Sequence, residues 1–225
     1  MKLVIFDLDD TLIDFASTRV VAYDALAELL EREGLDAAGY MKACAAMDKP
    51  LFKQFEQGLL TRQEYRLRRF SDPFAAIGLE AVPELVQRLN KLFMDVVNDS
   101  PRVYDDVHAV LGALRERDVR TAILTNGPSD GQRRKLKATG LGDMVDFIAI
   151  GEEVGFSKPL PQAFHNVVGK FSLGNEHALM VGDSPELDYD AALNAGLKAL
   201  LLDRDGLYRE SGRAAIASLL DVLGR

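Results

Sequence analysis

Residues 2–14 read KLVIFDLDDTLID, and this stretch decides how the rest of the chain is interpreted. Its apolar run, Leu3 to Phe6, is typical of a strand buried on both faces of a sheet. Three acids follow directly, Asp7, Asp9 and Asp10. Like charges at such spacing repel one another and resist transfer out of water. Water, a bound cation or a reaction that uses one of the acids must therefore compensate them.

Composition limits the kinds of partner that this chain of 225 residues can have. A formal net charge of -8 argues against a broad basic face for nucleic acid, although a local site can still hold a small anion. The single cysteine, Cys44, excludes an internal disulfide. The N-terminal apolar run is too short for a signal peptide, and no stretch approaches the ~18 apolar residues of a membrane span. We expect a cytoplasmic protein, monomer or homodimer, with neither nucleic acid nor membrane as partner.

The periodicity of apolar residues changes once along the chain. From about residue 15 to 100 the spacing indicates helices only, with 41–70 reading as one continuous helical pattern. From residue 101 onward, helical segments alternate with short apolar strands, which favours a parallel sheet covered on both faces. The prediction is an α/β, doubly wound parallel sheet formed by 1–14 and 101–225. An all-helical domain, 15–100, is inserted after its first strand.

Polar side chains follow four of the predicted strands at the point where each ends. In open α/β sheets, ligands bind outside the carboxyl ends of the strands, so these side chains are expected to meet at one edge. In chain order they are Asp7, Asp9, Thr125, Asn126, Lys158, Asp183 and Ser184.

The acids of this set are suited to a hard cation. Asp7, Asp9 and Asp183 offer oxygen ligands, and Mg²⁺ is commonly held by one or two carboxylates while it keeps several waters. The spacing does not match a calcium-binding EF-hand loop, and a zinc site is disfavoured without nearby His or Cys. A bound Mg²⁺ would also offset the repulsion at the end of the first strand.

The other members of the set are suited to phosphoryl transfer. The turn LTNGPSDG, residues 124–131, offers a Thr hydroxyl and backbone amides to an anion, and Lys158 adds a positive charge. Positioning and charge neutralisation are most of what phosphoryl transfer requires. A carboxylate can also act as the nucleophile, and Asp7 is the best placed, at the strand tip. Asp9, two residues on, is able to protonate a leaving oxygen and then activate water.

Four motifs in this order resemble those of the haloacid dehalogenase (HAD) superfamily of hydrolases: DLDDTL from Asp7, LTNG from Leu124, SKPLP from Ser157 and VGDSPELDYDAALNAG from Val181. The resemblance covers the core from Met1 to about Asp203. It implies a Rossmann-like core, and the helical insertion resembles the family's C1-type cap.

The resemblance also implies residue roles and a Mg²⁺-dependent phosphatase acting on a small phosphorylated metabolite. Asp7 would be the nucleophile and Asp9 the general acid and base. Thr125, with Asn126 beside it, would bind the phosphoryl group, and Lys158 would steady the charge on nucleophile and phosphate. The implied protein ligands of Mg²⁺ are Asp7, the backbone carbonyl of Asp9 and Asp183, with Asp188 as an outer partner.

Other functions remain open at this point. A phosphomutase resembles this chain in core and cap, and the sequence offers no decisive mark against it. A 2-haloacid dehalogenase would need no acid at position 9, because halide leaves without a proton, so Asp9 argues against that function. The presence of Asp9 also argues against phosphonate cleavage. A non-catalytic binding module is the alternative of another class. In the basic run RQEYRLRRF, Arg62, Arg66 and Arg69 are candidates for facing the substrate, although a solvated helix face is the simpler explanation.

Overall fold

A computed structural model describes residues 1–224, apart from the side chain of Glu56. The chain forms two compact units. One contains Met1–Ala16 and the residues from Pro101 onward, and the other contains Ser17–Ser100. The domain limits predicted from the sequence, at residues 14/15 and 100/101, stay a prediction.

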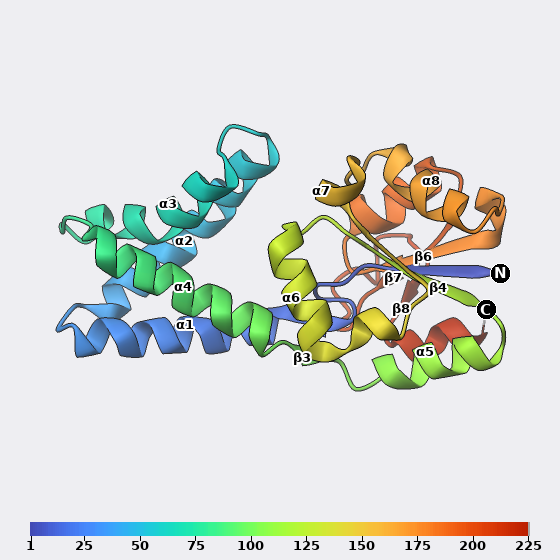
Figure 1. Ribbon diagram of the computed structural model, residues 1–225, viewed down its shortest axis with the longest axis horizontal. Helices are drawn as coiled ribbons and strands as arrows, with labels where there is room; N and C mark the ends of the chain where they lie inside the picture. The colour runs from blue at the N-terminus through green and yellow to red at the C-terminus, as the bar shows by residue number, and fades with distance from the viewer. Residues whose placement is uncertain (225) are drawn as a thin grey trace. The chain divides into compact units, whose positions relative to one another are not determined.

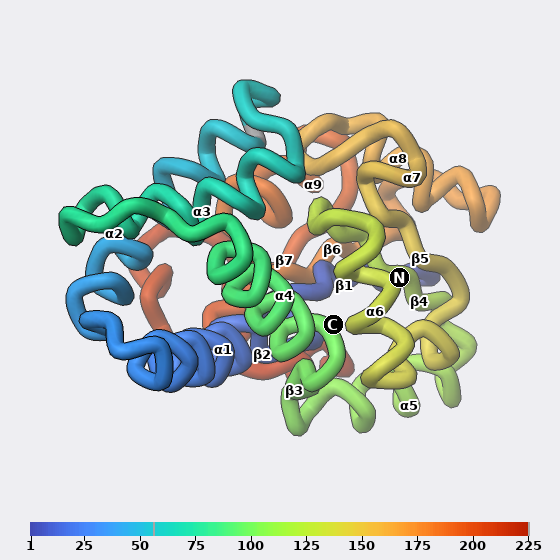
Figure 2. Tube along the Cα trace, turned by 60° about the vertical axis from the view of Figure 1, so that its left-hand side comes forward, coloured from blue at the N-terminus to red at the C-terminus, as the bar shows by residue number. Residues whose placement is uncertain are grey.

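The first unit is built on a six-stranded parallel sheet with strand order β5-β4-β1-β6-β7-β8 (Figures 1 and 2). This confirms the predicted fold class. Its strands are β1 (Leu3–Phe6), β4 (Arg120–Thr125), β5 (Phe147–Ile150), β6 (Ala178–Gly182), β7 (Lys198–Leu202) and β8 (Ala215–Ile216).

Apolar side chains alternate between the two faces of this sheet, and helices cover both. On one face, Val4 and Phe6 of β1 pack with a cluster that includes Val110 and Leu111. On the other face, Leu3 and Ile5 pack with residues of helices on the opposite side. The helices of this unit are α5 (Val107–Glu116), α6 (Ser129–Thr139), α7 (Gly151–Val154), α8 (Pro161–Lys170) and α9 (Ala191–Asn194), with short turns η1 (Leu141–Asp143), η2 (Asn175–His177) and η4 (Leu219–Gly224) and the π-helix η3 (Pro185–Asp190).

The strand order reverses direction beside β1. From β1 the chain adds β4 and then β5 on one side, and then crosses to add β6, β7 and β8 on the other. The crevice at such a switch point is where open α/β sheets bind ligands. Asp7, directly after β1, and Asp183, directly after β6, lie on its two sides.

A two-stranded antiparallel sheet, unforeseen from the sequence, pairs β2 (Ile13–Asp14) with β3 (Arg102–Val103). It lies in the first unit, at the two points where the chain leaves for the helical unit and returns from it. With two residues in each strand, its apolar pattern is too short to predict. The last strand, β8, also has two residues and was not predicted from the sequence for the same reason.

The helical unit consists of α1 (Phe15–Arg32), α2 (Ala37–Glu56), α3 (Arg62–Ala76) and α4 (Pro83–Asp99) (Figure 2). The continuous helix expected over 41–70 is wrong. Thr61 and Glu64 form a capping box, in which each side chain accepts a hydrogen bond from the other's backbone N–H, and α3 begins there. Within the described residues, no helix is long and apolar enough to cross a membrane.

Candidate active site

The buried ammonium group of Lys158 bridges the carboxylates of Asp7 and Asp188. Lys158 Nζ donates to Asp7 Oδ1 and to Asp188 Oδ1, each at 2.6 Å. All three side chains are almost completely buried. The backbone N–H of Ser184 donates to the other oxygen of Asp188 at 3.0 Å, so both oxygens of Asp188 are engaged. The structure thus joins three segments of the chain that the sequence predicted to meet.

Asp183 reaches the same place by another contact. Thr11 Oγ1 donates to Asp183 Oδ1 at 3.2 Å and accepts from the backbone N–H of Asp183 at 3.1 Å. Thr11 belongs to the DLDDTL stretch and is fully buried. This pair fixes the end of β6 against the loop that follows β1.

The end of β6 also requires a glycine. A Cβ on Gly182 would lie 2.3 Å from Cγ of Asp188, closer than side-chain atoms can approach. Because Asp188 holds Lys158, the absence of a side chain at Gly182 leaves room for the whole ion-paired group.

Burial and neighbouring acids oppose ionisation of two of the carboxyls. Burial raises the pKa of Asp7 well above its usual value, and the charges of Asp188 and Asp183 add to this effect, while Lys158 opposes it. Burial, followed by the charges of Asp188 and Asp10, raises the pKa of Asp183 to about 6. Burial alone would lower the pKa of Lys158, but the charges of Asp188 and Asp7 outweigh it and hold the pKa above its usual value.

These residues fit a divalent cation. Asp7, Asp183 and Asp188 each present a carboxylate oxygen, and the three oxygens lie within 4.8 Å of one another. The donor set is oxygen only, which suits Mg²⁺. Burial first, and then the neighbouring carboxylates, raise the pKa of Asp7 and of Asp183, and a cation bound here would offset the repulsion among these acids.

Asp9 points to a different set of partners, which sequence reasoning missed. Lys135 Nζ donates to Asp9 Oδ1 at 2.6 Å, and Gln132 Nε2 donates to Asp9 Oδ2 at 3.0 Å. Both partners come from α6 and are buried, and Lys135 Nζ also lies 4.2 Å from the ring centroid of Phe15. Polar residues one turn apart on the buried face of α6, beside the apolar Leu136, were the signal that would have found them.

Gln132 connects Asp9 to the predicted phosphate-binding residue Thr125. Gln132 Nε2 donates to Thr125 Oγ1 at 2.6 Å, in addition to its bond to Asp9. An amide donor in this position occupies an acceptor site of the hydroxyl and leaves the O–H of Thr125 able to donate to an anion. Thr125 is buried at the end of β4.

Asn126 is engaged with the backbone of Lys158. Its Oδ1 accepts from the Lys158 N–H at 2.8 Å, and its Nδ2 donates to the Lys158 carbonyl at 2.7 Å. The side chain therefore fixes the loop that carries Lys158. A role for Asn126 in phosphate binding would fall to its backbone.

The turn before α6 offers fewer hydrogen-bond donors to an anion than the sequence suggested. The backbone N–H of Ser129 donates to Glu152 at 2.8 Å, and its hydroxyl bonds to Glu153. Two of the donors at the start of α6 are thus taken by carboxylates of α7. Glu153 also pairs with Arg133.

Asp10 and Ser184 have structural contacts. Asp10 has a left-handed backbone, with φ of 60°, and its Oδ1 accepts from the N–H of Ala16 at the start of α1. Ser184 Oγ accepts from the N–H of Leu187 and so caps η3.

Comparisons with known proteins identify the family of this chain. A model of the haloacid dehalogenase-like hydrolase family matches residues 1–196. The chain belongs to the haloacid dehalogenase-like hydrolases. It is 32% identical to the phosphoserine phosphatase of Thermus thermophilus, over 96% of this chain and 93% of that one. It is 30% identical to the pyrimidine 5'-nucleotidase PynA of Streptococcus pneumoniae, over 88% of this chain and 82% of that one.

A solved HAD-hydrolase has the same fold over nearly its whole length. The structure of YfnB from Bacillus subtilis superposes with a TM-score of 0.81 and 26% sequence identity, and covers 99% of this chain and 97% of that one. That crystal structure contains magnesium. As a HAD-like hydrolase, the present chain is an enzyme whose relatives include phosphatases.

Proposed function

We propose that this protein is a Mg²⁺-dependent phosphatase that hydrolyses a small phosphomonoester through an aspartyl-phosphate. One observation carries the proposal: the carboxylate at the tip of β1 is held by a buried lysine within a group of three carboxylates. A buried Asp7 with one oxygen fixed at 2.6 Å from Lys158 Nζ is a positioned nucleophile, and the charge of Lys158 favours its ionised form.

In the first step, a carboxylate oxygen of Asp7 attacks phosphorus and the bond from phosphorus to the ester oxygen breaks. The leaving oxygen takes a proton from Asp9, whose carboxyl is held by Lys135 and Gln132. The Thr125 O–H donates to a phosphoryl oxygen. Lys158 offsets the negative charge that develops between Asp7 and the phosphate.

In the second step, Asp9 takes a proton from water. The resulting hydroxide attacks phosphorus, and the bond from phosphorus to the Asp7 oxygen breaks. Inorganic phosphate leaves, and Asp7 and Asp9 return to their starting states. The same group thus acts first as acid and then as base, which needs a carboxyl whose position stays fixed.

Mg²⁺ would be held by Asp7, the backbone carbonyl of Asp9 and Asp183. Asp188 would act as a positioning residue, because Lys158 and the Ser184 N–H already engage its two oxygens. When bound, the cation supplies positive charge next to the nucleophile and the phosphoryl oxygens. The magnesium in the YfnB structure supports this part of the proposal.

The helical unit would serve as a cap of the C1 type, with the limits 15–100. Lids of this kind exclude water and contact the part of the substrate that does not react. Among relatives, the named substrates of the phosphatases differ in this part: phosphoserine and pyrimidine nucleotides. A small phosphorylated metabolite is the substrate class that these relatives support.

Hydrolysis of p-nitrophenyl phosphate tests the proposal. The purified protein should release p-nitrophenol with Mg²⁺ and stop when EDTA removes the cation. Asp7→Asn should abolish turnover and leave the circular dichroism spectrum unchanged. Full activity in EDTA would refute the role of the metal, and full activity of Asp7→Asn would refute the nucleophile. Halide release from 2-chloropropionate, with no phosphate release from any ester, would favour the dehalogenase.

A further inference from the structure

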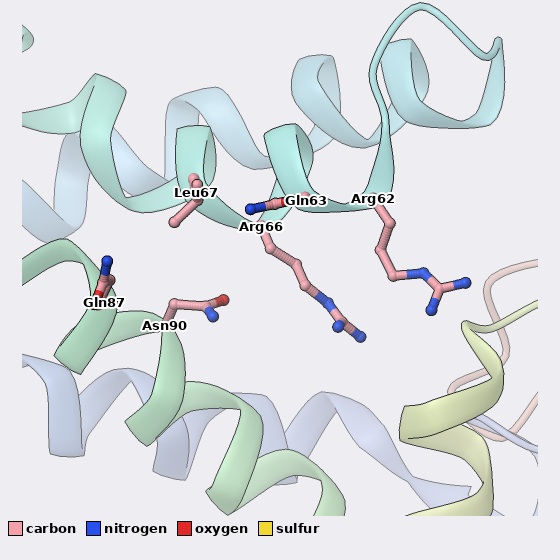
Figure 3. Close-up of a pocket in the computed structure, with 6 residues that line it drawn as sticks. All are labelled: Arg62, Gln63, Arg66, Leu67, Gln87 and Asn90. Carbon is pink, nitrogen blue, oxygen red and sulfur yellow. The ribbon is translucent and has the colours of Figure 1, made fainter. Parts of the chain in front are cut away.

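Arginine side chains are partly or fully buried in both units of the chain. In the helical unit, Arg62 and Arg66 line a pocket of about 540 Å³ between α3 and α4 (Figure 3). All residues that line this pocket, and the rings around the buried Arg69, belong to the helical unit itself. Arg204 differs from them, because it lies in the first unit and contacts the loop that follows β1.

Arg204, two residues after β7, fixes the backbone of that loop. Its Nη2 donates to the carbonyl oxygen of Thr11 at 3.2 Å. Its guanidinium carbon lies 3.9 Å from the ring centroid of Tyr104, whose backbone N–H donates to the carbonyl oxygen of Leu12 at 3.1 Å. Two consecutive carbonyl groups of the loop are therefore held by residues that the sequence did not single out.

Asp106 fixes the orientation of Arg204. The guanidinium group donates to both oxygens of Asp106, at 2.9 Å each, which is a two-point contact between planar groups. Asp106 Oδ2 also accepts from the hydroxyl of Ser218 at 2.7 Å and from the N–H of Leu219 at 2.9 Å. Burial would raise the pKa of Asp106, but the contacts with Arg204 and Ser218 hold it below its usual value. At neutral pH the carboxylate is therefore a charged, fixed partner for Arg204.

Thr11 connects Arg204 to the acids after β6. The carbonyl oxygen of Thr11 accepts from Arg204, while its hydroxyl donates to Asp183 Oδ1 at 3.2 Å and accepts from the N–H of Asp183 at 3.1 Å. Because Thr11 is fully buried, a shift of its backbone would also move its hydroxyl. Contacts thus run without a gap from Asp106 through Arg204 and Thr11 to Asp183.

We propose that Arg204 is a positioning residue of the cation site, which fixes Thr11 and thereby holds Asp183 in the orientation that binds Mg²⁺. The inference rests on the Mg²⁺ site of the proposed function. Outer partners that orient a metal ligand typically change metal affinity about 10- to 100-fold. We therefore expect a loss of about 10-fold for Thr11→Val, and of about 3- to 10-fold for Arg204→Met, which acts one contact farther away.

The direction of the change separates positioning from the effect of charge. Removing a positive charge near carboxylates strengthens their attraction for a cation. If only the charge of Arg204 mattered, Arg204→Met would bind Mg²⁺ more tightly than the wild type. If Arg204 only joined the C-terminal segment to the core, the variant would have a lower Tm and an unchanged affinity while folded. A loss of affinity in the folded variant is expected only from positioning.

Calorimetric titration with Mg²⁺ alone measures this affinity in the intact protein, well below its Tm and without substrate. The variants are Arg204→Met, Thr11→Val and the two combined. Because Arg204 acts through the hydroxyl of Thr11, the double variant should bind within about twofold of Thr11→Val, rather than show the product of the two losses. Where circular dichroism shows that Arg204→Met is unfolded, Arg204→Lys replaces it, since lysine keeps the charge but lacks the planar fork.

Arg120→Met is the matched control. Arg120 pairs with Asp146 at 2.8 Å, so the variant also removes an arginine from an ion pair. Arg120 begins β4, however, whereas the site lies at the other end of the strand, beside Thr125. The affinity of Arg120→Met for Mg²⁺ should equal that of the wild type.

The inference is overturned if the Arg204 variant binds Mg²⁺ as tightly as the wild type or more tightly. It is also overturned if the double variant shows the product of the two single losses. A wild type that binds Mg²⁺ but releases no phosphate from p-nitrophenyl phosphate would refute the phosphatase, and the calorimetric comparison would still decide the role of Arg204. A wild type that binds no Mg²⁺ would refute the metal site and this inference together.

Discussion

Replacing Lys158 with methionine should destabilise the folded protein more than any other single loss of charge at this site. The change keeps an unbranched side chain of similar length but removes the ammonium group. Asp7 and Asp188 each lose a contact of 2.6 Å. Lys158 is 5% exposed and Asp188 is 0% exposed, so water cannot replace the lost partner without rearrangement.

The size of the effect follows from what is left behind. Removing one partner of a buried ion pair costs about 3–5 kcal/mol, because the remaining charge is uncompensated. Here one substitution leaves two acids without their cation, so we expect about 4–5 kcal/mol at neutral pH. Protonation of the acids limits the cost, since burial already raises the pKa of Asp7. Against a typical total stability of about 5–15 kcal/mol, such a loss is large.

Urea unfolding of the full chain in EDTA, followed by circular dichroism, measures this difference. The raised pKa of Lys158 means that its contribution is complete below the usual lysine pKa and is lost only as the pH rises through the higher folded value. At pH 7 the full effect is therefore present. It should shrink as the pH falls and Asp7, whose pKa burial raises, takes up a proton.

Two variants test the cause rather than the mere presence of an effect. Lys198→Met makes the same change at an exposed position of β7 and should shift the unfolding midpoint far less. Asp188→Asn, added to Lys158→Met, should recover part of the loss by removing one of the stranded charges. If Lys158→Met unfolds within about 1 kcal/mol of the wild type at pH 7, or if Asp188→Asn makes it worse, the reasoning about burial and charge is refuted.

Three further predictions concern the neighbouring residues. Burial and neighbouring acids raise the folded pKa of Asp183 to about 6, so its contribution to stability in EDTA should be full below about pH 4 and should decline as the pH rises through about 6. In thermal melts, Mg²⁺ should therefore raise Tm at about pH 7–8 and hardly change it at about pH 5. A shift in Tm that does not depend on pH would contradict this prediction. Lys135→Met should lower kcat more than it changes KM, because Asp9 loses its contact of 2.6 Å with the ammonium group. Lys135→Arg keeps the charge and should retain part of kcat. Equal effects of the two variants would point to a packing role for Lys135. Gly182→Ala should displace Asp188 and reduce both Tm and kcat. The control Gly112→Ala in α5, with no atom within 4 Å of the added Cβ, should be neutral or slightly stabilising. Full activity of Gly182→Ala would show that the backbone at the end of β6 can shift to accommodate a side chain.

The sheet was predictable because its strands are continuous apolar runs that alternate with helical patterns. Val4 and Phe6 face one layer of helices while Leu3 and Ile5 face the other, and this burial on both faces is what the pattern of β1 encodes. The two-residue strands β2 and β3 carry too little pattern for such a prediction. The interruption between α2 and α3 is made by Gly58, whose left-handed backbone follows the end of α2, and by the capping box that begins α3; the apolar period runs through both signals.

At the site, the sequence located the strand ends but not the contacts between side chains. Lys158 was found because it lies in a recognisable loop after a strand. Gln132 and Lys135 were missed because they lie inside a helix, where a polar residue is normally exposed. Only the tertiary contact with Asp9, 123 and 126 positions away in the chain, makes their burial favourable.

The three acids that follow β1 are tolerated because each one contacts partners of its own. Asp7 meets Lys158, Asp9 meets Lys135 and Gln132, and Asp10 accepts the N–H of Ala16. Each acid thus has partners of its own, and the repulsion that remains lies among Asp7, Asp10 and the acids that follow β6. This remaining repulsion between carboxylates raises the pKa of Asp7 and of Asp183 beyond the effect of burial. Because a divalent cation and a proton would compete for the same carboxylates, affinity for Mg²⁺ should fall as the pH drops through about 6.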